Sequence, residues 1–158
     1  MSIPFLYPVF LTLHIVGFTL FAGITLADFA AFRRFWKAWD RDPAEALLTR
    51  QITAAFPLLI RLGAITLILA GIGMMALVNG AFGEQTWFKI KMGFVLLIIV
   101  NGVLGGRLQG IQLRRLLDGV ASAAAVSPVL LRARIRLFHI VQLLLLLGVF
   151  VLSAFRFN

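Results

Sequence analysis

The sequence has no cysteine and few charged residues: 13% of its 158 residues are charged, and six are acidic. Without cysteine there are no disulfides and no thiolate metal sites. The acidic residues form no paired carboxylate site within an apolar segment. There is also no Ser/His/Asp set, phosphate-binding loop or HExxH motif. The sequence therefore gives little support to metal-dependent hydrolysis or to another soluble-enzyme chemistry.

Apolar residues dominate what is present. The hydrophobic share is 61% and the mean hydropathy is +1.02. A water-soluble domain of this size has too little interior to bury so much apolar surface. The formal net charge is +9, but the basic residues cluster at the ends of apolar segments, where anionic lipid headgroups lie. We therefore predict an integral membrane protein whose partner is the lipid bilayer, with no nucleic acid.

Four apolar segments are long enough to cross a bilayer, which takes about 20 helical residues. They cover residues 3–27, 52–78, 87–106 and 137–155, and they lack the period-two alternation of membrane strands. We predict an all-α fold, an antiparallel four-helix bundle in a single domain over residues 1–158. Its breaks are a short helix at 44–48, a turn at Asn79-Gly80, a small-residue linker at 121–126 and a helix start at Ser127-Pro128.

The distribution of basic residues predicts the orientation of the bundle, because cytoplasmic loops carry an excess of Lys and Arg. The first and third connections are rich in arginine. The second connection has only Lys89 and Lys91 nearby, and the N-terminus has none. We therefore expect both termini outside, in a bacterial inner membrane with the two basic loops in the cytoplasm.

Ionisable residues within the hydrocarbon are costly and are candidates for function. The candidates are the only two histidines, His14 and His139, together with Asp28, Arg61, Lys91, Arg136 and the uncharged Asn101. At 1.5 Å per residue, His14 lies ~16 Å and His139 ~24 Å from the outer ends of their spans. Each histidine shares its helix face with other polar residues, and Gly17 lies one turn below His14.

Neutral imidazole is a ligand of haem iron, and a helical bundle can hold haem between facing helices. We therefore predict haem b with His14 and His139 as iron ligands. Gly17 is a further candidate cofactor-binding residue, and Arg61, Lys91 and Arg136 are candidate partners of the haem propionates. Three arrangements stay open: one tilted bis-histidine haem, two haems, or one haem on His14 alone. The alternative is that each histidine only forms a hydrogen bond to a neighbouring helix.

Short motifs add a family resemblance over most of the chain. Leu13-His14-Ile15 followed by Phe21-Ala22-Gly23 resembles the first helix of HemJ-type membrane protoporphyrinogen oxidases and of the wider copper-resistance-D-like group. The Trp87–Lys91 segment is similar to the lysine-containing third helix of that family. The resemblance implies that His14 binds haem b and that Lys91 is a catalytic residue. The chain departs from the family at His139-Ile140, where the family often has Asn-Glu.

Taken together, these features predict a haem b-binding membrane oxidoreductase that transfers electrons to or from a quinone or another membrane partner. The resemblance implies an alternative, protoporphyrinogen oxidase activity with a porphyrin substrate. Two further alternatives are a small ion or metal transporter and a structural subunit of a larger membrane complex. A homo-oligomer is compatible with each of them.

Overall fold

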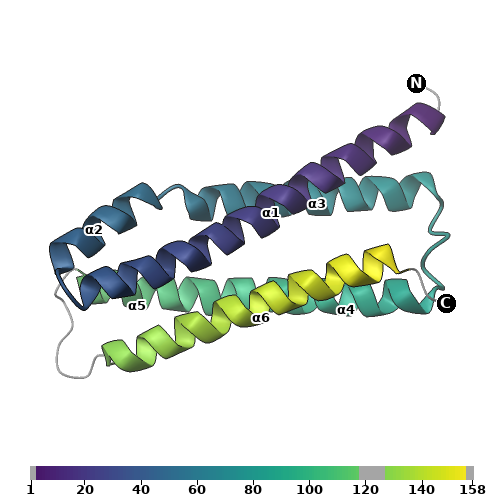
Figure 1. Ribbon diagram of the computed structural model, residues 1–158. Coiled ribbons are helices and arrows are strands. Elements are labelled where there is room, and N and C mark those ends of the chain that lie inside the picture. The colour runs from purple at the N-terminus through teal and green to yellow at the C-terminus, as the bar shows by residue number, and fades with distance from the viewer. Residues whose placement is uncertain (1–2, 118–126, 156–158) are drawn as a thin grey trace. The chain divides into compact units, whose positions relative to one another are not determined.

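The computed structural model describes residues 3–117 and 127–155, and these residues are almost entirely helical (Figure 1). The helices are α1 (Ile3–Trp39), α2 (Pro43–Ile52), α3 (Phe56–Leu77), α4 (Thr86–Val100), the π-helix η1 (Asn101–Gly106), α5 (Arg107–Leu117) and α6 (Pro128–Ala154). No strand occurs among the described residues, so the predicted all-α class is confirmed.

Four helical segments are long and apolar enough to cross a membrane. They are Phe5–Trp39, Ala44–Leu77, Thr86–Arg115 and Pro128–Ala154. In the most apolar window of each, between 6% and 28% of the residues are buried within the protein. Their surfaces are therefore largely aliphatic and outward-facing, which suits contact with lipid chains better than contact with water.

The chain divides into two compact units, Met1–Gln85 and Thr86–Asn158. In the first unit, α1 and α3 pack at glycines. A Cβ added to Gly17 would lie 2.7 Å from the nitrogen of Leu67, and one added to Gly63 would lie 2.7 Å from the nitrogen of Phe21. The contacts pair early residues of α1 with late residues of α3, so the two helices run in opposite directions. Glycine is required because only a hydrogen atom fits between the two main chains.

Helix α2 packs on α1 and completes the first unit (Figure 1). The Asp42 side chain accepts a hydrogen bond from the Ala44 nitrogen at 2.9 Å, which caps the helix start next to Pro43. Ala46 is completely buried. The short helix predicted at 44–48 is therefore present but longer, because it continues to Ile52.

In the second unit, α6 packs against α4 and η1. Phe94 lies beside Gly148, and Asn101 contacts the Phe138–Gln142 turn, so α4 and α6 also run in opposite directions. The third predicted span, 87–106, is helical, but its last six residues form a π-helix, which the apolar pattern did not predict.

The predicted breaks agree with the structure where it describes them. Asn79 and Gly80 have φ angles of 51° and 73°, the left-handed backbone of a tight turn. Ser127 Oγ accepts a hydrogen bond from the Leu130 nitrogen at 3.2 Å and caps α6. The predicted linker at 121–126 lies outside the described residues.

Candidate functional site

His14 is held against the main chain of α3. Its Nδ1 lies 2.9 Å from the carbonyl oxygen of Leu67. Because a carbonyl oxygen only accepts, Nδ1 is the donor, and in the neutral form of an imidazole held in this way the lone pair is on Nε2. Gly71 leaves room for the ring: a Cβ there would lie 3.3 Å from His14 Cε1. Close packing of two helices thus sets both the tautomer and the place of this imidazole.

Gly17 shares this helix interface with His14, whereas Arg61 does not. Gly17 is buried, and the backbone of α3 occupies the space beside its Cα. The structure therefore gives Gly17 a packing role, and its predicted role in cofactor binding stays a prediction. Arg61 is exposed and lies about 160° around α3 from Gly63, the residue that faces α1. It projects from the side of α3 opposite to His14.

Thr25 belongs to the polar face predicted for the first helix. It is 3% exposed, and its hydroxyl donates to the carbonyl oxygen of Phe21 at 2.6 Å. Such a bond back to the preceding turn is the usual way for a threonine to satisfy its hydroxyl in an apolar helix. His14 and Thr25 therefore both turn inward, and each uses a main-chain carbonyl as its acceptor.

His139 is the second candidate ligand and lies on α6 with 4% of its surface exposed. Its Nδ1 is 2.8 Å from the carbonyl oxygen of Ile135, one turn earlier on the same helix. The neighbouring Phe138 ring meets the imidazole edge-on, with ring centroids 5.0 Å apart. The carbonyl acceptor makes Nδ1 the donor here too, so Nε2 is the ring atom that each histidine would offer to iron.

An amide pair joins η1 to α6 one turn beyond His139. Asn101 Nδ2 donates to Gln142 Oε1 at 2.7 Å and to the carbonyl oxygen of Phe138 at 3.3 Å. Gln142 is 3% exposed. The sequence singled out Asn101 as a polar residue inside a span but assigned it no partner. Gln142 shares the helix face of His139, and that shared face was the available signal for this contact.

Neither Lys91 nor Arg136 takes part in these hydrogen bonds. Lys91 is half-buried and precedes Asn101 by ten residues, so it lies about 15 Å from Asn101 along the helix axis. Since Asn101 is level with Phe138 and Gln142, the predicted catalytic lysine is not beside His139. Arg136 is exposed, and it precedes His139 by three residues. Arg136 is therefore closer to His139 than Lys91 is.

Among residues 3–117 and 127–155, no group of three or more His, Cys, Asp or Glu side chains is arranged to hold a metal ion. Haem iron takes four of its ligands from the macrocycle, so one or two histidines are a sufficient protein contribution. The donor chemistry of His14 and His139 therefore fits haem better than it fits a bare metal ion.

No protein-family model, curated protein or solved structure gives a significant match to the chain. The resemblance to HemJ-type oxidases consequently stays a prediction from the short motifs quoted above. The interpretation of the site rests on its own hydrogen bonds and burial.

Proposed function

We propose that the protein is a haem b-binding integral membrane protein that transfers electrons within the bilayer, with a quinone as a candidate partner. In this proposal the four apolar helices form an antiparallel bundle in a bacterial inner membrane, with both termini outside. The observation that carries the proposal is the His14 imidazole within an apolar segment, held at Nδ1 by the Leu67 carbonyl, so that Nε2 is the atom that would bind iron.

The hydrogen bond at Nδ1 is a feature that the two histidines share with metal-ligating histidines. Histidines that ligate metals usually donate their other ring N–H to a carbonyl or carboxylate, which orients the ring and raises its basicity. His14 and His139 both have this arrangement, with Leu67 and Ile135 as acceptors. A purely structural histidine would form the same bond, so the two interpretations differ in what Nε2 contacts.

Haem, when bound, supplies one-electron chemistry, and the protein supplies the ligands, a low-dielectric surrounding and cationic groups near the propionates. His14 and His139 are the proposed ligands. Arg136 is the cation retained as a propionate partner, because Lys91 lies about 15 Å along its helix from the level of His139. Arg61 projects away from the His14 interface, which weakens its case. The enzyme alternative, protoporphyrinogen oxidation, would instead depend on His14 and Lys91 and would not need His139.

An optical spectrum of the detergent-purified protein, oxidised and then dithionite-reduced, tests the proposal. We expect a Soret band and sharp reduced α and β bands, which low-spin haem gives. His14→Ala should abolish or shift these bands, whereas Thr12→Ala, at an exposed position of the same helix, should leave them unchanged. His139→Ala shows whether the second histidine also binds iron. A featureless visible spectrum after expression with ample haem would refute the proposal.

A further inference from the structure

Helix α1 continues well past the segment that a bilayer requires. Its 37 residues correspond to about 55 Å of helix, compared with a hydrocarbon core of about 30 Å. The predicted span ends near residue 27, and the remainder carries a cluster of aromatic and basic residues. This remainder and α2, which packs on α1, form what we call the α1–α2 corner, residues 28–52.

One side of the corner is cationic. Arg33, Arg34 and Lys37 are exposed and lie within an arc of about 100° around α1. None of the three forms a hydrogen bond or an ion pair with any residue that the structure describes. The opposite side of the same turns is buried, with Phe35 4% and Trp36 2% exposed. The three cations therefore have room for an anionic partner beyond the residues that the structure describes.

The other part of the corner is aliphatic. Helix α2 buries Ala46 and turns Leu47, Leu48 and Ile52 outward, with 44%, 59% and 79% of their surfaces exposed. On a helical wheel these three lie about 100° to 240° from Ala46, so they cover the face of α2 that is turned away from the protein. If α2 were in contact with water, these three side chains would form an exposed apolar patch, which soluble proteins usually avoid.

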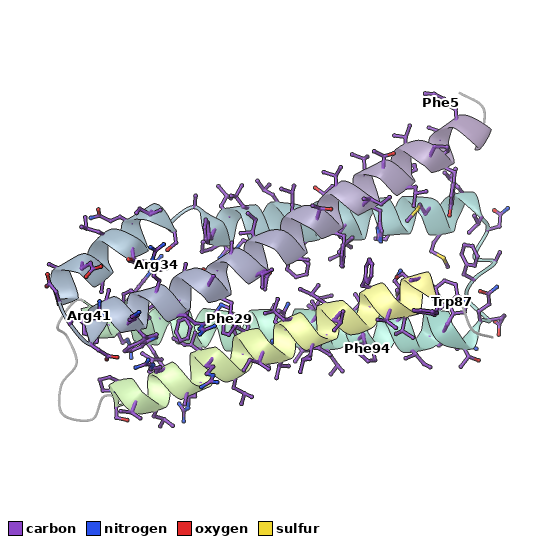
Figure 2. All side chains as sticks on the ribbon, in the orientation of Figure 1. Phe5, Phe29, Arg34, Arg41, Trp87 and Phe94 are labelled. Atoms are coloured by element: carbon purple, nitrogen blue, oxygen red, sulfur yellow. The ribbon has the colours of Figure 1, made fainter. Side chains whose placement is uncertain are left out.

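Cations beside an exposed aliphatic helix are the combination found in helices that lie in the membrane interface. Figure 2 labels Arg34 and Arg41 at the end of α1 that adjoins α2, with Phe5 at the opposite end. We propose that the α1–α2 corner binds anionic phospholipids. Arg33, Arg34 and Lys37 contact the phosphate groups, and Leu47, Leu48 and Ile52 insert among the acyl chains. A nucleic acid or an acidic soluble protein would complement the cations but would leave the aliphatic face in water.

A comparison of two arginine pairs tests the proposed contact between the cations of the corner and lipid phosphate groups. The full-length protein is titrated with phosphatidylglycerol and with phosphatidylcholine, and the retained lipids are counted by native mass spectrometry. We expect the wild-type protein to prefer phosphatidylglycerol. Arg33→Gln/Arg34→Gln should lower this preference by about five-fold for each arginine. The charge-conserving pair Arg33→Lys/Arg34→Lys should keep it. Arg114→Gln/Arg115→Gln is the matched control, an exposed arginine pair in the last turn of α5.

Two results would overturn the proposal that these cations bind lipid phosphate groups. Equal loss in the Arg33/Arg34 and Arg114/Arg115 glutamine variants would mean that the lipid responds to overall charge. Absence of a phosphatidylglycerol preference, combined with binding of soluble poly-glutamate that Arg33→Gln/Arg34→Gln removes, would assign the face to an acidic macromolecule.

Because the sequence has no cysteine, a single introduced cysteine can be labelled to test whether the aliphatic face of α2 inserts among acyl chains. A nitroxide is attached to Leu48→Cys, or to Leu47→Cys if the first variant does not fold, in vesicles containing phosphatidylglycerol. We expect collisions with oxygen to exceed collisions with a water-soluble nickel chelate, because oxygen concentrates among acyl chains. Ala81→Cys, at an exposed position in the turn after Gly80, is the control that should favour nickel. Equal access of nickel to both positions would show that α2 lies in water and would refute insertion.

Discussion

His14 and Leu67 are joined across α1 and α3 by a hydrogen bond of 2.9 Å from Nδ1 to the main-chain oxygen. The main chain of α1 also approaches this residue of α3 closely, because a Cβ at Gly17 would lie 2.7 Å from the Leu67 nitrogen. The position of the imidazole thus depends on how closely the two helices pack. Substitutions that alter the packing of α1 on α3 should therefore also alter the position of the His14 imidazole.

Gly17→Ala should separate α1 from α3. The added methyl group meets main-chain atoms of Leu67, which cannot move aside as the end of a flexible side chain can. Overpacking of this kind costs about 1–3 kcal/mol, and unfolding in mixed detergent micelles measures it. Gly23→Ala is the matched control on the same helix, since nothing lies within 4 Å of its added Cβ. Equal stability of the two variants would contradict the close packing.

Asn101 and Gln142 should be energetically coupled. Their side chains are joined at 2.7 Å between η1 and α6. Hydrogen bonds between membrane helices contribute about 0.6 kcal/mol on average and up to about 1.7 kcal/mol. A double-mutant cycle with Asn101→Leu and Gln142→Leu should give a coupling free energy in that range. Asn101→Leu should be the costlier single change, because Asn101 also donates to the Phe138 carbonyl. Additive effects of the two substitutions would show that the pair is not formed.

Hydropathy was sufficient to predict the helical class and the number of long apolar segments, because both depend on continuous apolar runs. The turn at Asn79-Gly80 and the cap at Ser127 were predictable for a similar local reason. Glycine and asparagine tolerate positive φ, and serine accepts a hydrogen bond from a free amide at a helix start. These features depend on neighbouring residues and need no knowledge of tertiary contacts.

The partners of the polar side chains could not be predicted in this way. Whether Arg61 faces α1 depends on the rotation of α3, which Gly63 sets through its approach to Phe21. The π-helix at Asn101–Gly106 could not be predicted from hydropathy, since hydropathy does not distinguish a π-helix from an α-helix. The acceptors of His14 and His139 are main-chain carbonyls. Every residue has a carbonyl, so no residue type identifies those acceptors.

Ser127→Ala should destabilise the start of α6. The Ser127 hydroxyl accepts the Leu130 N–H at 3.2 Å, and removal of such a cap costs about 1 kcal/mol. Hydrogen exchange at the Leu130 amide should quicken by about five-fold, because 1.4 kcal/mol corresponds to ten-fold. Ser127→Asp restores a side-chain acceptor and should return exchange to the wild-type rate. If Ser127→Asp exchanges as fast as Ser127→Ala, the cap does not protect this turn.

Gly71→Ala distinguishes a ligand from a structural histidine at His14. The added methyl group would lie 3.3 Å from Cε1 and 3.5 Å from Nδ1 of the imidazole, so the ring must shift by a few tenths of an ångström. Because the methyl group touches a side chain and no backbone atom, we expect a smaller loss of stability than for Gly17→Ala. If His14 binds haem iron, the shift should change the midpoint potential and the reduced α band of the purified protein. Gly23→Ala should change neither of them. Haem bands that are present but unaltered in Gly71→Ala would mean that the iron ligand is a residue other than His14.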